Sequence, residues 1–318
     1  MIMENLLTTY HPFVEIGVVF AVVAGALLVG WYKHWKAEAR KFAQSGHTPP
    51  PTGWAGKLFF NLSTRLLCFL TVGRITVVNR HKSPKRGRVI FAANHQLPCD
   101  FAMLRHGANR HFRMLTAADQ LTGLIGLLGA WMGVISVAFK QKSDGAAAEN
   151  GCIKAVAEDE GSLGIFPEGA LLPDNPNLSE NFRPGAVRIA RAAALASGSP
   201  VHIVPIAIFY NHDRKRADWT HRLFGRFRST FLGTRNPRHW DPIFKESLEG
   251  KSESEVAQIE AIREAKLRGY RQSRVTNYGG VVVVGDAIDI RDLPEDPIEA
   301  INKIRDAVAA LLVEAKKH

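Results

Sequence analysis

The stretch RVIFAANHQLPCDFAMLR (residues 88–105) joins an apolar run to a helix-like run through a short polar loop. The run from Arg88 to Ala93 predicts a buried strand, and Asp100 is well placed near the N-terminus of the helix that follows. Strands that alternate with helices are typical of a mainly parallel sheet with helices on both faces. The stretch therefore predicts an α/β fold whose polar loop lies at the carboxyl end of a strand, where the ligand sites of such sheets collect.

The same alternation continues along the chain. Further strands are predicted at 75–78, 162–166, 201–209 and 281–284, with a helix at 186–196. Asp296 and Pro297 predict the start of a last helix, because Asp caps helices and Pro suits their first turn. The uncharged run 121–138 contains four glycines, which favours a close-packed internal helix leading into a strand over a membrane span.

The composition narrows the class of partner. A net charge of +11 indicates an anionic partner, which can be nucleic acid, a phospholipid surface or a phosphorylated substrate. The three cysteines are widely spaced, so we expect neither a disulfide framework nor a metal site, and a reducing compartment. His106 and His111 have no partners at metal-ligand spacing, and we expect them at the surface.

The N-terminal segment favours a membrane among these partners. Residues 16–32 (IGVVFAVVAGALLVGWY) carry no charge and, with residues 12–15, reach the roughly 30 Å of a hydrocarbon core. The cations that follow, from Lys33 to Lys41, would keep the next domain on the cytoplasmic side, and a cleaved signal peptide would have them before the apolar run. We predict a membrane anchor at 1–41, as a transmembrane helix or one that only dips into the bilayer; a buried core helix is the alternative.

Three further segments bear on the domain organisation. Residues 42–53 are a linker rich in Pro and Gly. Residues 54–72 are apolar and could lie in the membrane interface, pack as a first core helix, or form a hairpin with the anchor. Residues 211–275 form a basic insertion in the domain 54–318; its cations and aromatics suit an anionic bilayer or single-stranded nucleic acid, and the anchor favours the bilayer over nucleic acid. A solvated excursion is the alternative, and Ser252 and Glu255 predict a capping box there.

His95 and Asp100, separated by four residues, are the candidate catalytic pair. Imidazole titrates near neutral pH, and a carboxylate can fix its tautomer. Asp100 would orient the ring while His95 accepts a proton from a hydroxyl that attacks a carbonyl, which predicts acyl transfer or hydrolysis. The spacing alone is also compatible with a surface histidine near a helix cap, and Cys99 as a nucleophile is a further alternative.

A second polar turn, Phe166-Pro167-Glu168-Gly169, also follows a predicted strand. Pro167 restricts the entry of the chain, and Gly169 lets the backbone approach a ligand. Glu168 could hydrogen-bond a polyol acceptor, with nearby amides available for a developing oxyanion.

Four blocks in this order resemble the glycerolipid acyltransferase family, typified by 1-acylglycerol-3-phosphate acyltransferases. They are Asn94-His95-x4-Asp100, GVISV (133–137), FPEG (166–169) and IVPIA (203–207). Residues 182–186 and 284–288 resemble further family stretches. The resemblance implies that 54–318 is an acyltransferase domain with His95 as general base and Asp100 as its partner. It also implies substrate-binding roles for the remaining motif residues: Asn94, Phe166, Pro167, Glu168 and Gly169. The acyl donor would be acyl-CoA or acyl-carrier protein, with no further cofactor.

Two departures from the family pattern concern the acceptor. Ala170 and Leu171 replace the Thr-Arg pair that usually follows Pro-Glu-Gly, and Lys140 stands near the position of a phosphate-handling arginine. Lysine offers a point charge rather than a bidentate fork, so Lys140 or Lys142 would be at best a substitute. These departures leave the phosphate of the acceptor open, whereas the resemblance implies acylation of a lysolipid such as 1-acylglycerol-3-phosphate. The alternatives are a non-phosphate lipid acceptor, an inactive lipid-binding relative and a lipid hydrolase, the last disfavoured because no Gly-x-Ser-x-Gly elbow occurs.

Overall fold

The computed structural model describes the residues of the predicted sheet and of most of the helices around it. These are residues 52–97, 99–117, 132–137, 142–158, 160–169, 182–211, 252–257 and 279–318, with the single positions 25, 129, 178 and 261. The predicted anchor at 1–41, nearly all of the linker 42–53, Lys140 and most of the insertion 211–275 lie outside these residues. The sequence predictions for those segments stay predictions.

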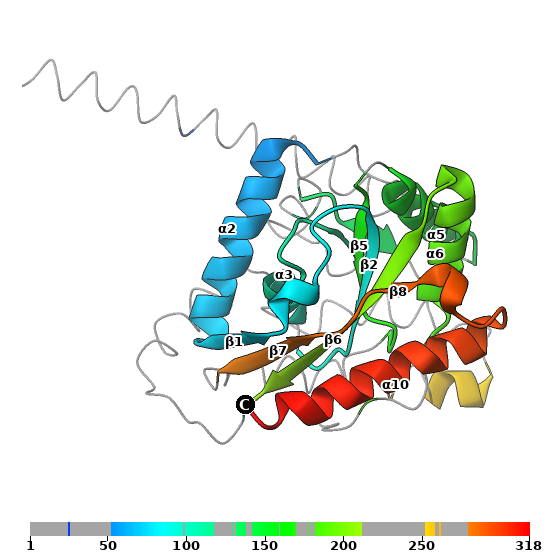
Figure 1. The fold of residues 1–318 in the computed structure, drawn as a ribbon. Coiled ribbons are helices and arrows are strands. Elements are labelled where there is room, and N and C mark those ends of the chain that lie inside the picture. Colours follow the sequence, from blue (N-terminus) through cyan, green and yellow to red (C-terminus); the bar gives the residue numbers. More distant parts are fainter. Residues whose placement is uncertain are drawn as a thin grey trace, which may run out of the picture.

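One eight-stranded sheet forms the centre of the domain (Figure 1). Its strands run in the order β1-β7-β6-β2-β5-β3-β4, and β8 pairs with β6 beyond this path. Their bounds are β1 Ile75–Val78, β2 Arg88–Ala93, β3 Arg113–Ala117, β4 Ile135–Val137, β5 Ser162–Ile165, β6 Val201–Tyr210, β7 Gly280–Val284 and β8 Ile288–Asp289. The predicted α/β class is confirmed.

The sheet is mostly parallel, as predicted. Strand β2 lies between β5 and β6 and is parallel to both, and β3 is parallel to β4 and β5. Strand β1 is parallel to β7, whereas β6 pairs antiparallel with β7 and with β8. The parallel centre places the carboxyl ends of β2 and β5 at the same edge, so the loops that follow these two strands are neighbours.

Helices cover both faces of the sheet (Figure 1). On one face lie α2 (Trp54–Thr71) and α3 (Asp100–Ala108); on the other lie α5 (Lys142–Ala157), α6 (Gly185–Ser197) and α10 (Pro297–Ala315). Two short 3-10 helices are at Arg80–Lys82 and Ile290–Asp292. Because successive strand residues point to opposite faces, Phe91 of β2 packs toward α2 and α3 while Ile90 packs toward α5 and α6.

Helix α2 packs against the domain through one face only. Phe60, Thr64 and Cys68 are buried on the side that contacts α3, so the segment is a core helix, one of the three possibilities left open by its sequence. The opposite side exposes large apolar residues at helical spacing: Trp54, Leu58, Leu62, Leu66 and Phe69. Across the described part of the chain, no helix combines the length and hydropathy needed to span a membrane.

Several local predictions are confirmed residue by residue. Strands β1 and β2 have the predicted bounds. The Asp296 carboxylate accepts from the amides of Ile298 and Glu299 at the start of α10, and Pro297 takes the first helical position. The capping box is present, because the amide of Ser252 donates to Glu255 Oε2 at 3.0 Å. Strand β3 and helix α5 were not predicted from the sequence.

Candidate active site

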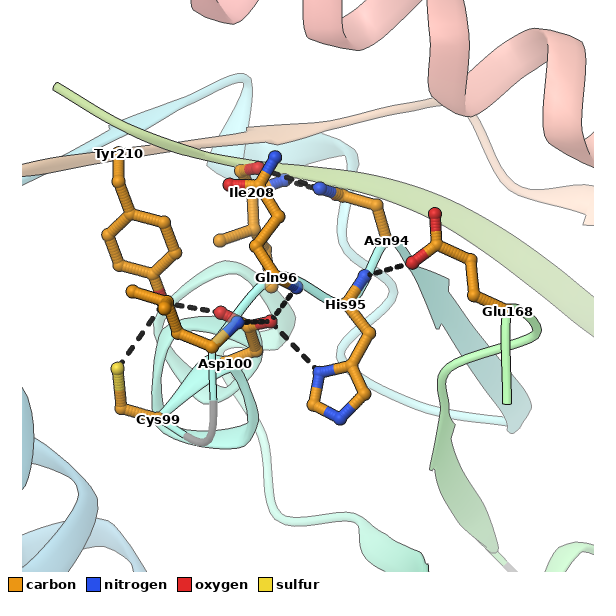
Figure 2. A network of polar contacts seen from close by, with 9 residues as sticks. Asn94, His95, Gln96, Cys99, Asp100, Glu168, Ile208 and Tyr210 are labelled. Atoms are coloured by element: carbon orange, nitrogen blue, oxygen red, sulfur yellow. Dashed lines mark hydrogen bonds and ion pairs between the residues drawn. The ribbon is translucent and has the colours of Figure 1, made fainter. Parts of the chain in front are cut away.

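The loop at residues 94–99 begins at the carboxyl end of β2 and is tied to β6 by its first residue (Figure 2). The Asn94 side chain is buried, its Nδ2 donates to the carbonyl oxygen of Ile208 at 2.9 Å, and the Ile208 amide donates to Asn94 Oδ1 at 2.7 Å. An amide side chain can make this paired contact because it carries a donor and an acceptor side by side. Asn94 thus fixes the loop against the neighbouring strand.

Asp100 is fully buried at the first turn of α3, and its two oxygens bind different groups. Oδ2 accepts from the amides of Gln96 and Leu97, at 2.5 and 2.8 Å, and contacts His95 Nδ1 at 2.9 Å. Oδ1 accepts from the hydroxyl of Tyr210. Two main-chain amides and the Tyr210 hydroxyl therefore fix the orientation of the carboxylate.

The His95 ring is held on two sides. Its Nδ1 faces the Asp100 carboxylate, so this nitrogen carries the proton and donates. Its plane stacks on Phe166, with ring centroids 4.1 Å apart and an interplanar angle of 7°. Figure 2 shows the other nitrogen, Nε2, turned away from the network, and the side chain is 21% exposed. The geometry leaves Nε2 as the atom that can accept a proton from an incoming hydroxyl.

The turn after β5 supports this arrangement from the second strand. Glu168 is buried, and its Oε2 accepts from the main-chain amide of His95 at 2.7 Å. Gly169 has φ +66°, a conformation that favours glycine, and its amide donates to the Phe166 carbonyl at 3.0 Å. Glu168 therefore holds the histidine loop from the β5 side while Phe166 orients the ring.

The structure brings most of the predicted site residues to one place. The loop after β2 and the turn after β5 meet through the contacts of His95 with Glu168 and Phe166. Asn94, Asp100, Pro167 and Gly169 belong to the same loop and turn. Their catalytic and binding roles stay predictions, and Lys140 lies outside the described residues. In the part of the chain that is described, no group of His, Cys, Asp and Glu side chains has the geometry of a metal site.

Tyr210 and Arg183 were not named as site residues from the sequence. Tyr210 is the last residue of β6, and burial followed by the charge of Asp100 raises its pKa well above the ordinary value, so it stays a donor. Cys99 is buried with its Sγ 3.4 Å from the Tyr210 hydroxyl. The Arg183 guanidinium lies against Gly169, because a Cβ added at that glycine would meet Nε at 2.7 Å. Arg183 lies in the stretch 182–186 that resembles the family, whereas the role of Tyr210 follows only from the pairing of β6 with β2.

Comparison with known proteins bears on this geometry. Residues 74–209 match the family model described as Acyltransferase, a segment that contains the loop 94–99, Asp100 and the turn 166–169. Comparison with the curated proteins found no match. Among solved structures, the chain is similar to the 1-acyl-sn-glycerophosphate (LPA) acyltransferase PlsC from Thermotoga maritima, at 17% identity over 100% of this chain and 99% of that chain, with a TM-score of 0.46. Residues 74–209, which contain this site, therefore form an acyltransferase domain.

Proposed function

We propose that this acyltransferase moves a fatty acyl group from acyl-CoA or acyl-carrier protein to the hydroxyl of a lysophospholipid such as 1-acylglycerol-3-phosphate. The observation that carries the proposal is the Asp100–His95 contact, which binds Nδ1 and turns Nε2 outward. Acyl transfer from a thioester to a hydroxyl needs one group that removes the hydroxyl proton and then returns a proton to the leaving sulfur. His95 has the geometry for that work.

The chemistry follows from the two ring nitrogens. As the acceptor oxygen attacks the thioester carbonyl, His95 Nε2 removes its proton and a tetrahedral oxyanion forms. Collapse of the oxyanion breaks the C–S bond, and the leaving sulfur takes the proton back from Nε2. The Asp100 carboxylate stabilises the imidazolium that forms, because three donors besides the imidazole hold it in place.

Substitution of His95 tests this proposal. Purified protein in phospholipid vesicles would be given labelled acyl-CoA and a panel of lysolipids, with both lipid product and free fatty acid measured. His95→Ala should abolish transfer, whereas His81→Ala, which removes an exposed histidine of the 3-10 helix 80–82, should leave it intact. Turnover retained in His95→Ala would overturn the general-base role. Release of free fatty acid alone would identify a hydrolase. No turnover by the unsubstituted chain would identify an inactive lipid-binding relative.

The acceptor class is proposed from Arg183. Its exposed guanidinium lies beside Gly169, one residue from the glutamate that contacts the His95 loop, and among the described residues it has no carboxylate partner. Ala170 and Leu171 remove the arginine usual in this family, so Arg183 supplies a planar fork for a phosphate close to the position where one is expected. This supports a phosphate-bearing acceptor.

Acceptor competition tests that role. Arg183→Gln should raise KM for lysophosphatidic acid roughly 10- to 100-fold, the effect of losing a charge-assisted pair, and leave KM for monoacylglycerol unchanged. Arg188→Gln is the matched control, because Arg188 is exposed on α6 and pairs with Glu149 instead. Equal use of both acceptors by the unsubstituted protein, with no effect of Arg183→Gln, would favour the non-phosphate acceptor.

Membrane attachment is proposed from two segments. The apolar run of the anchor 1–41 and the exposed apolar face of α2 both suit a bilayer, and exposed Lys57 and Arg65 flank that face with positive charge. The cations after the apolar run support a catalytic domain at the cytoplasmic face. Deletion of residues 1–41 should move much of the protein to the soluble fraction, and salt should release the remainder if the basic insertion binds electrostatically. Unchanged sedimentation would overturn the anchor.

A further inference from the structure

The Tyr210 hydroxyl binds the catalytic carboxylate from a position that the family match does not include. The matched segment ends at residue 209, and Tyr210 closes β6 directly after it. Its side chain is 1% exposed, and its hydroxyl donates to Asp100 Oδ1. A buried tyrosine needs a hydrogen-bond partner for its hydroxyl, and the partner of Tyr210 is Asp100, the residue that contacts His95.

The two oxygens of Asp100 have different partners, and the bond from Tyr210 is made to Oδ1. Oδ2 serves the amides of Gln96 and Leu97 and the imidazole. Within the described residues, Oδ1 has one hydrogen-bond donor, the Tyr210 hydroxyl. A fully buried carboxylate oxygen without a donor is strongly unfavourable, and loss of the hydroxyl would leave the carboxylate held through Oδ2 alone.

Strand β6 holds both ends of the catalytic loop. Ile208 binds Asn94, which precedes His95, and Tyr210 binds Asp100, which follows the loop. Ile208 makes its contacts through its main-chain amide and carbonyl, and Tyr210 through its side-chain hydroxyl. The strand therefore acts as a rigid support for the His95–Asp100 pair (Figure 2).

We propose that Tyr210 is a positioning residue for the His95–Asp100 pair: its hydroxyl fixes the Asp100 carboxylate and limits the negative charge that the carboxylate presents to His95. The inference rests on the proposed function, because the pair must act as a base for its positioning to affect turnover. It predicts both a loss of rate and a directed change in pH dependence. A purely structural role would not predict these two effects together.

The direction of the pH effect follows from charge. A donor on Oδ1 takes up part of the carboxylate's charge, so its removal leaves more charge facing the protonated imidazole. The imidazolium is then favoured, and the acidic limb of the kcat/KM profile moves to higher pH. Among the residues that the structure describes, the other titratable groups near the pair are Cys99 beside α3, Cys68 on α2 and Glu168 after β5. All of them are retained in the variants below.

Tyr210→Phe is the first test. It should lower kcat roughly 10-fold with little change in KM, and move the acidic limb upward by roughly half a pH unit. Ser83→Ala is the matched control, because Ser83 is buried and its hydroxyl donates to the Ala108 carbonyl at 2.6 Å, at the far end of α3. The control should lower the melting temperature and leave the pH profile in place. Equal profiles for Tyr210→Phe and the unsubstituted protein would overturn the inference.

A second test keeps the ring and its hydroxyl. Site-specific replacement of Tyr210 by 3-fluorotyrosine makes the hydroxyl a stronger donor, so the acidic limb should move to lower pH, opposite to the phenylalanine variant. This replacement decides the matter if Tyr210→Phe fails to fold. A limb that does not move in the 3-fluorotyrosine protein would contradict the proposed coupling.

A measurement without turnover separates this inference from the proposed function. The ring nitrogens of His95 would be followed by NMR in histidine-labelled protein, with the signal assigned from His95→Gln. The titration midpoint of that signal should rise in Tyr210→Phe and stay in place in Ser83→Ala. Absence of acyl transfer by the unsubstituted chain would overturn the proposed function, while a moving midpoint would still support the positioning role. An unmoved midpoint would overturn the positioning role whatever the turnover.

Discussion

The loop 94–99 with Asp100 and the outer face of α2 depart in opposite directions from the rule that apolar groups are buried and polar groups exposed. The loop buries Asn94 and Asp100, and both have their hydrogen bonds made within the domain. The outer face of α2 exposes a row of large apolar side chains from Trp54, 79% exposed, to Phe69, 72% exposed. Buried polar groups and exposed apolar patches are the informative exceptions in a folded protein. The first region is complete by itself, whereas the second needs a partner to cover it.

The largest expected effect on turnover is at Asp100, which is buried and contacts His95. Asp100→Asn should lower kcat by roughly 10³- to 10⁴-fold, because a neutral amide cannot stabilise the imidazolium, and its NH2 group replaces an oxygen that accepts from either the loop amides or the Tyr210 hydroxyl. Circular dichroism and thermal melting should show a retained fold, and acyl-CoA turnover in vesicles gives the rate. A loss of less than about tenfold in a folded variant would mean that His95 acts without its carboxylate partner.

The apolar face of α2 provides the second test. Combined Leu58→Gln, Leu62→Gln and Leu66→Gln should weaken vesicle binding by roughly 100-fold, because each leucine gives up about 1 kcal/mol of apolar transfer. Binding would be measured by co-sedimentation with anionic phospholipid vesicles, using protein without residues 1–41 so that the anchor does not mask the effect. Turnover of a water-soluble short-chain acceptor should stay unchanged.

A control with the same number of apolar residues makes this comparison specific. Leu195, Ile298 and Val313 are also exposed but lie apart, on α6 and α10. Their combined replacement by Gln should leave vesicle binding in place, since single exposed apolar residues are ordinary at protein surfaces. Equal losses in the two triple variants would show that general surface hydropathy, and not the α2 face, governs binding.

The secondary structure was predictable where local patterns are strong. The β-branched and apolar runs of β1, β2 and β7, and the Asp296–Pro297 cap, carry their signal within a few residues. Strand β3, RMLTA, lacks such a run, and its Arg113 is buried through a contact with Glu158. Helix α5 is rich in Ala and Gly, so its apolar stripe is weak. Both elements depend on tertiary packing that their own sequences do not display.

The site was predictable to the extent that it is local. His95 and Asp100 are close in sequence, and their contact follows from a strand end, a loop and a helix start. The contacts of Asn94 with Ile208 and of Asp100 with Tyr210 join residues more than a hundred positions apart. They depend on β6 lying beside β2, and sheet order does not follow from residue patterns along one chain.

His111 tests the inner face of α2 by pH. We expected it at the surface, but its ring packs edge-on against Phe60 with centroids 5.2 Å apart, and burial lowers its pKa from 6.5 to about 4. His111 therefore becomes protonated below about pH 6.5 in the unfolded chain, but only below about pH 4 in the folded protein. The free energy of unfolding therefore falls as the pH decreases through this window. The loss should reach roughly 2 kcal/mol between about pH 7.5 and about pH 5.

Urea unfolding at the two pH values measures this loss. His111→Gln keeps a donor near the Met132 carbonyl but has no proton to bind, so its stability should fall less over the same interval. The difference between the two proteins isolates His111 from the carboxylates that also titrate in acid. Parallel losses would mean that the inner face of α2 does not exclude the protonated imidazole.

The smallest effect is expected at the polar contact that fixes α2 against α3. Arg105 Nη2 donates to Asn61 Oδ1 at 2.9 Å, and burial followed by the charges of Arg65 and Arg80 lowers the Arg105 pKa to about 10. Asn61→Ala should reduce the free energy of unfolding by about 1 kcal/mol, since the lost bond to a charged group outweighs the better helix propensity of Ala. Asn61→Asp should have the opposite sign, because a carboxylate opposes the positive charge. No response to either change would mean that apolar packing alone sets the orientation of α2. A response of both signs would show that a polar contact on the inner side helps to determine which apolar side chains face outward.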